Sequence, residues 1–397
     1  MSVQKLADCC RFYSGGTPDK GNADFWKGDI PWFSPKDIKS FDLVAAQDRI
    51  SDAAVRLSAT RMMEPGTILV VGRSGVLAHT LPVGIIRQPS AFNQDIRAIV
   101  PNPGHDAEFI ALYLKANQAL VLKDGVKRGP TVHSLIADFL EELEIPKFSL
   151  PEQRQIAARL KAQLAEVETA RQAAQAQVRD AALLRTKLVD AAFDACEQWH
   201  PIATVAKVQS GYAFKSEDFK TSGVRLLRNT NILPGKVYWD SAVYLEESAA
   251  DRYPGYALEE DDVLISLDRP LISSGIKVAR VGADDVPSLL LQRVGRFLLK
   301  SGAIDAGFLY AFLQSSRFIG AISWHDQSLG VPHISPGQVE AVELPLLSLH
   351  EQQQLVSRLQ SQLTEAATLA QAAAAQLAEI ERLPQRILAQ AFAEPSP

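Results

Sequence analysis

The segment Ile145-Pro-Lys-Phe-Ser-Leu-Pro-Glu-Gln-Arg-Gln (residues 145–155) returns later in the chain as Leu344-Pro-Leu-Leu-Ser-Leu-His-Glu-Gln-Gln-Gln (residues 344–354). Aligned without a gap, residues 145–167 and 344–366 share 11 identities in 23 positions. The match keeps its register as far as Ala192-Phe193 and Ala391-Phe392. One inserted residue would rotate every later side chain of a helix by about 100°. The gapless repeat therefore predicts a continuous helix in each copy.

Apolar residues recur every seven positions along each copy, flanked by further apolar residues three or four positions away. This spacing on an Ala- and Gln-rich segment is typical of a two-helix coiled coil, with each helix about 65 Å long at 1.5 Å per residue. Ten residues are therefore predicted to pair the helices: Leu160, Val167, Ala174, Ala181 and Leu188 in the first copy, and Leu359, Ala366, Ala373, Ile380 and Ile387 in the second.

Local signals mark where these helices begin. Ser149 and Ser348 are predicted N-caps, and Glu152 and Glu351, three residues later, complete a capping box in each copy. Pro384 conflicts with the second helix and is expected to kink or split it near its end.

The residues before each helix are richer in Gly, Pro and aromatic side chains. Short apolar runs at 67–71 and 262–266 predict strands, whereas 108–114 and 307–313 have helical patterns. We therefore predict an α+β fold with two mixed α/β globular domains, each followed by a long helix, in a pseudo-twofold repeat. The expected boundaries are 1–148 and 198–347 for the domains, and 149–197 and 348–397 for the helices.

Composition narrows the class of protein. The 397 residues carry 41 basic and 46 acidic side chains, a net charge of −5, so a uniformly basic nucleic-acid coat is excluded. No run approaches the length of a transmembrane helix, and the three cysteines (Cys9, Cys10 and Cys196) cannot build a disulfide framework. We expect a cytoplasmic protein without a membrane partner.

Enzyme motifs are scarce. The sequence has neither a Walker A loop nor Gly-x-Gly-x-x-Gly, and its seven histidines lack zinc-ligand spacing, so we expect no metal site. Asp19, Asp37 and Lys39 superficially match a Pro-Asp…Asp-x-Lys metal-nuclease pattern. Such a nuclease needs Asp-x-Lys at the end of an apolar strand, and Ser34-Pro35-Lys36 precedes it here, which favours a chance match.

Several segments carry a family resemblance. Ser14-Gly-Gly-Thr-Pro, Phe25-Trp-Lys-Gly-Asp-Ile-Pro-Trp-Phe and Phe92-Asn-Gln-Asp-Ile stand in the first half. Ser210-Gly-Tyr-Ala-Phe-Lys-Ser and Leu227-Arg-Asn-Thr-Asn-Ile stand in the second, which lacks the Gly-Thr-Pro and Trp-rich segment. Together with the repeat, these segments resemble the specificity (S) subunits of type I restriction-modification systems.

The resemblance implies a subunit without catalysis of its own. Each globular domain would read one half of a split DNA sequence, while an antiparallel helix pair holds the domains apart and docks methyltransferase (M) subunits, probably two. Restriction (R) subunits would add cleavage. No cofactor is expected on this chain, and S-adenosylmethionine is expected on the M subunit. The half-site spacing is expected near one DNA turn.

DNA contacts are expected from basic and amide side chains on loops. Because residues 1–150 hold 17 basic and 17 acidic side chains, the basic groups must gather on one face. Glycine beside arginine permits close approach to a phosphate, whereas Trp26, Trp32 and Phe33 are expected in the core rather than stacked on bases. The candidates are Lys36, Arg73, Ser74, Lys127, Arg128, Thr131, Lys215, Arg228, Asn229, Asn231, Arg269, His325 and Gln327.

Two rival interpretations remain open from the residues alone. One is an interaction scaffold whose domains bind proteins, which predicts binding insensitive to salt, whereas DNA binding weakens steeply as salt rises. The other is the metal nuclease described above, which predicts magnesium-dependent cutting by the isolated chain.

Overall fold

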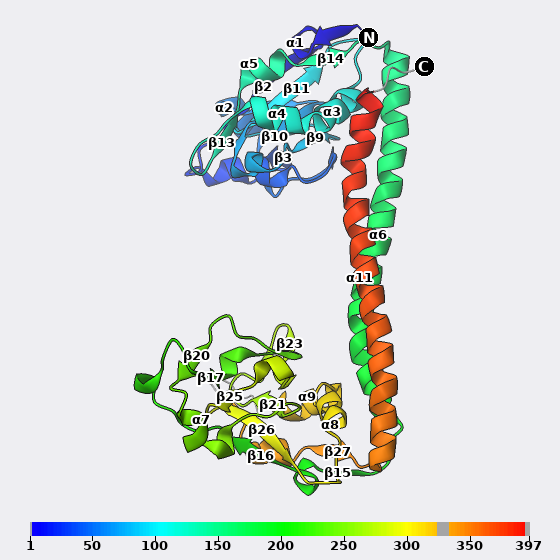
Figure 1. Ribbon diagram of the computed structural model, residues 1–397. Coiled ribbons are helices and arrows are strands. Elements are labelled where there is room, and N and C mark those ends of the chain that lie inside the picture. The colour runs from blue at the N-terminus through cyan, green and yellow to red at the C-terminus, as the bar shows by residue number, and fades with distance from the viewer. Residues whose placement is uncertain (1, 324–332, 394–397) are drawn as a thin grey trace. The chain divides into compact units, whose positions relative to one another are not determined.

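The computed structural model describes residues 2–323 and 333–393, which form two compact units (Figure 1). Unit 1 combines residues 1–174 with 376–397, and unit 2 comprises residues 175–375. The long helices α6 (Leu150–Asp194) and α11 (Leu349–Ala393) each contribute to both units. Each unit contains a mixed α/β globule, so the predicted fold class is confirmed.

The main sheet of unit 1 has five strands in the order β2-β11-β7-β9-β4. The predicted strand at 67–71 is β7, whose four residues are all buried. Helix α3, predicted from 108–114, contacts β9. The elements are β2 (Cys10–Ser14), β4 (Asp42–Leu43), β7 (Ile68–Val71), β9 (Val83–Ile86), β11 (Ile96–Pro101) and α3 (Ala107–Ala116).

Two smaller sheets and a two-stranded antiparallel pair, β1 with β14, complete unit 1. The order β5-β3-β10-β6 includes a parallel pair between β3 and β10, and a three-stranded sheet runs β12-β13-β8. The remaining elements of unit 1 are β1 (Val3–Lys5), β3 (Ile30–Phe33), β5 (Asp48–Ile50), β6 (Arg61–Met63), β8 (Arg73–Ser74), β10 (Ser90–Phe92), β12 (Val126–Lys127), β13 (His133–Leu135), β14 (Glu144–Pro146), α1 (Leu6–Cys9), α2 (Asp52–Leu57), α4 (Gln118–Asp124), α5 (Ala137–Glu141), and the 3-10 turns η1 (Ala23–Trp26), η2 (Pro35–Asp37) and η3 (Gly75–Ala78).

Unit 2 repeats this plan with fewer strands. Its main sheet runs β16-β26-β21-β24, and its second sheet, β20-β17-β25, again contains a parallel pair, β17 with β25. The predicted strand at 262–266 is β21. The sheet elements are β16 (Ala206–Ser210), β17 (Val224–Leu227), β20 (Val243–Leu245), β21 (Val263–Ser266), β24 (Val278–Arg280), β25 (Ser288–Leu290) and β26 (Val294–Leu299).

Two short hairpins, one two-stranded pair formed by distant segments, and several short helices complete unit 2. They are β15 (Trp199–Pro201), β18 (Ile232–Leu233), β19 (Lys236–Val237), β22 (Leu271–Ile272), β23 (Gly275–Ile276), β27 (Glu343–Pro345), α7 (Ala249–Arg252), α8 (Ala306–Phe312), α9 (Ser316–Ser323), α10 (Pro336–Glu340), and the 3-10 turns η4 (Ile202–Thr204), η5 (Ser216–Asp218), η6 (Asn229–Asn231), η7 (Pro254–Tyr256) and η8 (Ala283–Asp285). None of the helices in the described part of the chain has the length and apolarity needed to span a bilayer.

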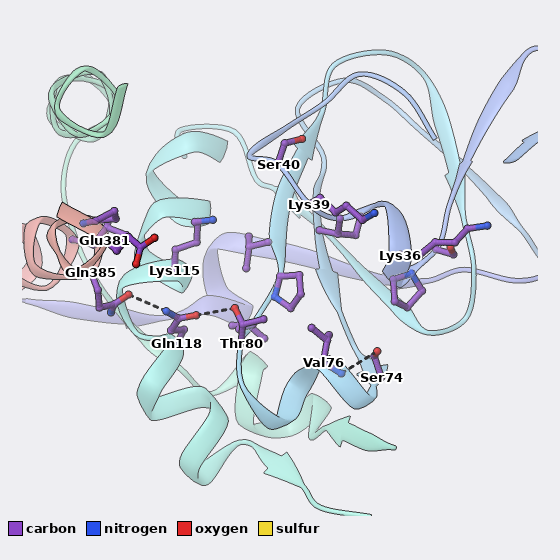
Figure 2. A pocket seen from close by; sticks show the side chains of 18 residues that line it. Lys36, Lys39, Ser40, Ser74, Val76, Thr80, Lys115, Gln118, Glu381 and Gln385 are labelled. Carbon is purple, nitrogen blue, oxygen red and sulfur yellow. Dashed lines mark hydrogen bonds between the residues drawn. The ribbon is translucent and has the colours of Figure 1, made fainter. Parts of the chain in front are cut away.

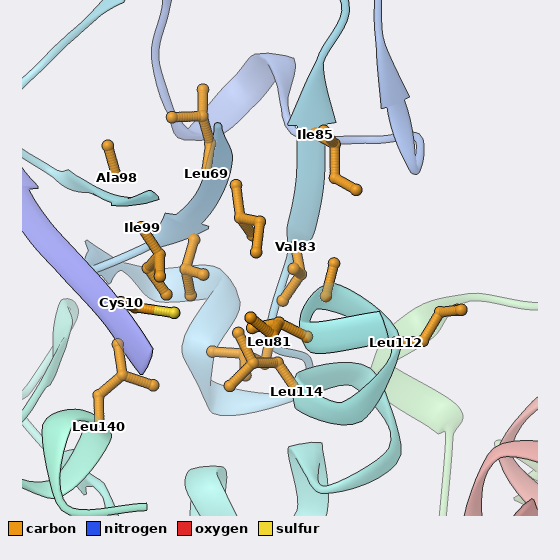
Figure 3. Close-up of a cluster of buried hydrophobic side chains, with 14 of the residues drawn as sticks. Cys10, Leu69, Leu81, Val83, Ile85, Ala98, Ile99, Leu112, Leu114 and Leu140 are labelled. Atoms are coloured by element: carbon orange, nitrogen blue, oxygen red, sulfur yellow. The ribbon is translucent and has the colours of Figure 1, made fainter. Parts of the chain in front are cut away.

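The core of unit 1 joins its main sheet to α3. Leu69, Val83 and Ile99, from three different strands, belong to one buried cluster with Leu112 and Leu114 of α3 (Figure 3). Each lies at 2% exposure or less. Burial of this apolar surface is the main source of stability for the frame.

Each unit is completed by the start of one long helix and the end of the other. In unit 1, Leu160 of α6 and Leu388 of α11 lie in the same core, and the Phe392 ring is 5.7 Å from Phe109. In unit 2, Phe193 of α6 lies 5.5 Å from Phe308, in a core that also holds Leu359 of α11. The two helices therefore pack antiparallel.

The ten residues predicted to pair the helices are all buried or half-buried. Leu160, Val167, Ala174, Leu359 and Ala366 are the most buried. The alanines keep this seam narrow, because a methyl group lets two backbones approach closely.

The repeated Ser-x-x-Glu-Gln segment attaches each helix to its globule. Glu152 accepts hydrogen bonds from the Ser149 amide (2.7 Å) and hydroxyl (2.6 Å), so the predicted capping box is confirmed, and Glu351 does the same with Ser348. Gln153, which is 1% exposed, accepts from the Asp106 amide at 2.8 Å and donates to the Phe148 carbonyl.

Gln352 repeats this arrangement in unit 2. It accepts a hydrogen bond from the Asp305 amide at 2.8 Å and donates to the Leu347 carbonyl at 2.8 Å. Because Asp106 and Asp305 are the N-caps of α3 and α8, each glutamine ties the long helix to the first turn of a domain helix. In both repeats the glutamate therefore caps the long helix, and the glutamine that follows it fastens this helix to the globule. We call Gln153 and Gln352 the glutamine clamps.

Pro384 does not split the second helix, contrary to the expectation from sequence. Helix α11 continues from Leu349 to Ala393 with Pro384 inside it. A proline removes one amide donor from the helix, and the turns on either side keep theirs. Pro384 is half-buried within unit 1, and the turn that follows it is held by the globule, because Gln385 donates to the Ala116 carbonyl at 2.9 Å and Leu388 is buried.

Candidate nucleic-acid interface

The three-stranded sheet of unit 1 brings together two basic segments that are far apart in sequence. Residue Ser134 of β13 pairs with Arg73 of β8 on one side and with Lys127 of β12 on the other. Side chains directly opposite in adjacent strands point to the same face of a sheet. Arg73, Ser134 and Lys127 therefore form a row across one face, which we call the basic row. Arg73 and Lys127 are exposed.

The hairpin between β12 and β13 extends this row. Arg128 and Thr131 are exposed at its tip, where the Gly129 amide donates to Nδ1 of His133 at 3.3 Å. Among the described residues, neither Arg73, Lys127 nor Arg128 has an acidic partner within ion-pair distance. Three unpaired cations on one exposed edge can contact phosphates or guanine edges.

Lys36 and Ser74, predicted with this group, are already engaged. Lys36 donates a hydrogen bond to Asp48 at 2.8 Å, and this contact raises the pKa of the Lys36 ammonium. The Ser74 hydroxyl caps η3 by accepting from the Val76 amide at 3.3 Å. Lys36 remains exposed, and an exposed ion pair is weak enough to exchange for a phosphate.

The nuclease interpretation finds no support in the geometry around Asp37. One carboxylate oxygen of Asp37 accepts from the Ser34 amide (2.9 Å) and hydroxyl (2.8 Å), and the other accepts from the Gln47 amide at 3.0 Å. Asp19 caps the Gly21 amide at 2.8 Å. The described residues contain no group of three or more His, Cys, Asp or Glu side chains arranged to hold a metal ion. Asp37 is a turn-capping residue.

The aromatic residues near this turn belong mainly to the core, as expected. Trp32 and Phe33 are buried, and Trp32 donates to the Gly16 carbonyl at 3.1 Å. Trp26 is half-buried and packs edge-on against Trp32 at 5.0 Å.

Unit 2 contains a segment with the same backbone hydrogen bond as the segment leading into β8 in unit 1, but its side chains carry different charges. The Gly72 amide donates to the Asp95 carbonyl in unit 1, as the Leu267 amide donates to the Arg293 carbonyl in unit 2. The next residue is Arg73 in unit 1 and Asp268 in unit 2. The Asp268 side chain accepts a hydrogen bond from Arg293 at 2.6 Å. Its backbone forms an isolated antiparallel β-bridge with His333, which is the counterpart of Ser134.

The predicted cations of unit 2 stand on separate segments of the chain, and no β-ladder pairs them as it pairs Arg73 and Lys127 among the described residues. Arg269 is exposed beside this edge with a φ of +45°, and Lys215 is exposed at the start of η5. His325 and Gln327 lie outside the described residues.

The Arg228–Asn231 segment forms a turn, and the prediction for Asn231 is corrected here. Asn231 is fully buried. Its side-chain Oδ1 accepts from the Arg228 backbone amide at 3.1 Å, and its Nδ2 donates to the Tyr238 carbonyl at 2.9 Å. The Arg228 guanidinium bonds to Ser241, and the Asn229 carbonyl accepts from Lys277. Asn231 is therefore unavailable to a base, because its polar atoms are already satisfied. It occupies the place that Asp37 has in unit 1.

Sequence reasoning missed Arg293, whose side chain is 65% exposed at the edge of unit 2. A signal existed, because Leu290-Leu-Gln-Arg293 matches Phe92-Asn-Gln-Asp95 in register with the parallel strands β25 and β10.

The glycines of the Ser-Gly motifs have a structural explanation. A Cβ on Gly15 or Gly211 would lie 2.2 Å from a carbonyl oxygen, of Phe92 or Leu291 respectively.

Comparison with known proteins identifies the family. Two stretches, residues 1–176 and 198–381, match the type I restriction modification DNA specificity domain. The chain therefore belongs to the family of type I restriction-modification specificity subunits, with two copies of the domain.

Similar proteins include two type I restriction enzyme specificity subunits. The chain is 41% identical over 162 residues to the EcoAI subunit of Escherichia coli, and 34% identical over 167 residues to the MjaVIII subunit of Methanocaldococcus jannaschii. These matches cover 41% and 42% of this chain, but 27% and 39% of the relatives. The matched region thus spans less than two fifths of each relative.

Two solved structures share the fold over almost the whole chain. The HsdS subunit from Thermoanaerobacter tengcongensis has a TM-score of 0.63 at 17% identity, with 98% of this chain and 96% of that chain covered. A structure concerned with complex assembly and conformational transition of the type I R-M system has a TM-score of 0.73 at 15% identity, with 98% and 97% covered.

Proposed function

We propose that this chain is the DNA-recognition subunit of a type I restriction-modification complex and that each unit recognises one half of a bipartite site. One observation carries the proposal: the same backbone arrangement occurs twice, and the corresponding position holds the exposed Arg73 in one copy and the buried Asp268, paired with the exposed Arg293, in the other. Two globules with the same backbone but different side chains at this position can form different contacts with base edges, as recognition of two different half-sites requires. In this role the chain binds DNA and carries out no catalysis itself.

The paired helices have a second role in this proposal. They set the spacing between the half-sites and dock two methyltransferase subunits, which would bind S-adenosylmethionine, while restriction subunits join for cleavage. The buried seam and the Gln153 and Gln352 clamps support this role, since a ruler must be stiff and firmly attached. The complex would act in the cytoplasm, where chromosomal DNA is found.

The decisive experiment maps methylated adenines across the genome of the host with and without this gene. A split motif that disappears with the gene is expected. An unchanged methylation pattern in a host whose methyltransferase subunit is active would contradict the proposal.

Two further changes test the division of labour. Exchange of residues 1–148 for the domain of another family member should change one half of the motif. Insertion of four residues near Gln175 should change the spacing and leave both half-sites as they were. A change in both halves, or an unaltered spacing, would contradict the modular arrangement or the ruler.

A further inference from the structure

Unit 1 contains a groove of about 920 Å³ between its globule and the last turns of α11 (Figure 2). Three segments of the globule and one of the helix form it. Its lining includes the η2 loop with Lys36 and Lys39, the η3 loop with Ser74 and Thr80, Lys115 at the end of α3, and Glu381 and Pro384 of α11.

The charges in this groove are unbalanced. Three of its lining residues are lysines and one, Glu381, is acidic. Lys36 is paired with Asp48. Within the described part of the chain, Lys39 and Lys115 have no carboxylate within ion-pair distance. With Lys36 paired to Asp48, Lys39 and Lys115 face a single lining carboxylate, Glu381, so the lining keeps a net positive charge.

Lys115 is the most unusual of the three. Burial lowers the pKa of its ammonium group, and its ammonium lies 6.0 Å from the centre of the Phe41 ring. A half-buried ammonium without a counter-charge carries a desolvation cost. An anion in the groove would offset that cost and favour the charged form of Lys115.

The groove chemistry belongs to unit 1 alone. The Ser34–Asp37 and Arg228–Asn231 turns close with the same backbone bond (Asp37 amide to Ser34 carbonyl, Asn231 amide to Arg228 carbonyl). This correspondence places Thr230 and Leu233 where unit 1 has Lys36 and Lys39.

The third lysine is also missing from unit 2. With Asp305 matching Asp106 as N-cap of the domain helix, the counterpart of Lys115 is Gln314. Gln314 accepts a hydrogen bond from Arg185 at 2.6 Å. A protein partner that docks on both units should meet the same groups twice. The occupant of a groove found in one unit should instead be specific to that unit.

We propose that this groove binds backbone phosphates of the DNA flanking the half-site recognised by unit 1, with Lys39 and Lys115 as the phosphate-binding groups. The inference rests on the proposed function. Lysine is a suitable partner because it contacts phosphate as a point charge. Ser74 lines the groove and directly follows Arg73 of the basic row, so the groove adjoins the candidate recognition edge.

The test measures DNA affinity of the assembled S–M complex against salt concentration, on a duplex carrying the motif found by methylation mapping. The variant Lys39→Ala with Lys115→Met keeps apolar bulk at the half-buried site. Loss of two phosphate contacts should lower the slope of log K against log salt by about two. Affinity should fall roughly tenfold or more, with the preferred sequence unchanged.

Two matched variants control for charge. Lys147→Ala removes an exposed lysine of unit 1 that does not line the groove, and it should leave the salt slope unchanged. Glu381→Gln removes the acidic group from the groove and should tighten binding.

The outcomes separate the inference from the function on which it rests. If the unaltered complex binds its motif and the double variant keeps the full salt slope, the inference is wrong while the function stands. A second outcome is that less of the double variant assembles with M, while the fraction that does assemble keeps the full salt slope. The groove would then bind an acidic protein segment, and the inference is again wrong. Lack of motif binding by the unaltered complex would remove the proposed function itself.

Discussion

The two units show the same backbone at one sheet edge, with the charges of two positions exchanged. Unit 1 has Arg73 in the edge strand and Asp95 in the turn beside it, whereas unit 2 has Asp268 and Arg293 at these places. The hydrogen bonds that hold the edge come from amides and carbonyls. Its side chains can therefore change sign without disturbing the backbone, and under the proposed function this freedom would let one fold acquire two DNA preferences.

Substitutions in the first three turns of α6 and α11, where these helices pack against the globules, should reduce stability more than substitutions elsewhere in the two units. Leu160→Ala and Leu359→Ala remove side chains that are 0% and 2% exposed, and each should cost about 2–5 kcal/mol of unfolding free energy. Chemical denaturation of the full chain measures this. Leu183→Ala, at a position 55% exposed, is the control and should change stability little. A mild effect at one leucine and a large effect at the other would show that the two attachments differ in strength.

The two glutamine clamps should have equal importance. Gln153→Ala and Gln352→Ala each leave a part-buried N-cap amide without its acceptor, which costs about 1–3 kcal/mol. Thermal unfolding of the two variants side by side tests the equivalence. Gln354→Ala, an exposed helix position, should be nearly neutral.

The basic row should distinguish the units in DNA binding. Arg73→Ala or Lys127→Ala should reduce the salt slope by about one if the residue contacts phosphate, or relax one base position at about 1–3 kcal/mol if it contacts a base. Methylation of a library of site variants separates these results. In unit 2, Asp268→Asn frees Arg293 and should strengthen binding. Equal loss from both changes would show that the edges are not used differently.

The smallest expected effect depends on pH. Burial disfavours the Glu108 carboxylate, but hydrogen bonds from Lys161 and Arg87 outweigh it and lower the Glu108 pKa. Its stabilising contribution is present above the unfolded pKa of about 4.3 and is lost as pH falls through the lower folded value.

Glu108→Gln should therefore reduce stability at neutral pH by up to about 1 kcal/mol and weaken the acid dependence. Urea denaturation at several pH values measures both. The counterpart in unit 2 is Gly307, so this network is confined to unit 1. An unchanged pH profile would show that the network contributes nothing.

Features with a local cause were predictable from sequence. The capping serines at 149 and 348 and the apolar strands at 68–71 and 263–266 depend on neighbouring residues, and each was identified correctly. The pairing of Arg73 with Lys127 through Ser134 depends on strand register between distant segments, which composition does not encode. Asn231 was misassigned because a polar residue that closes a buried turn looks the same in sequence as one that meets DNA.

The two units also differ in when they can be completed during synthesis. Unit 2 is one uninterrupted stretch, whereas unit 1 needs Leu388 and Phe392 from near the end of the chain. On the ribosome the core of the first globule therefore stays incomplete, with part of its apolar surface uncovered, until α11 emerges. The later stretch can mature before the earlier one, which reverses the usual order for multidomain chains.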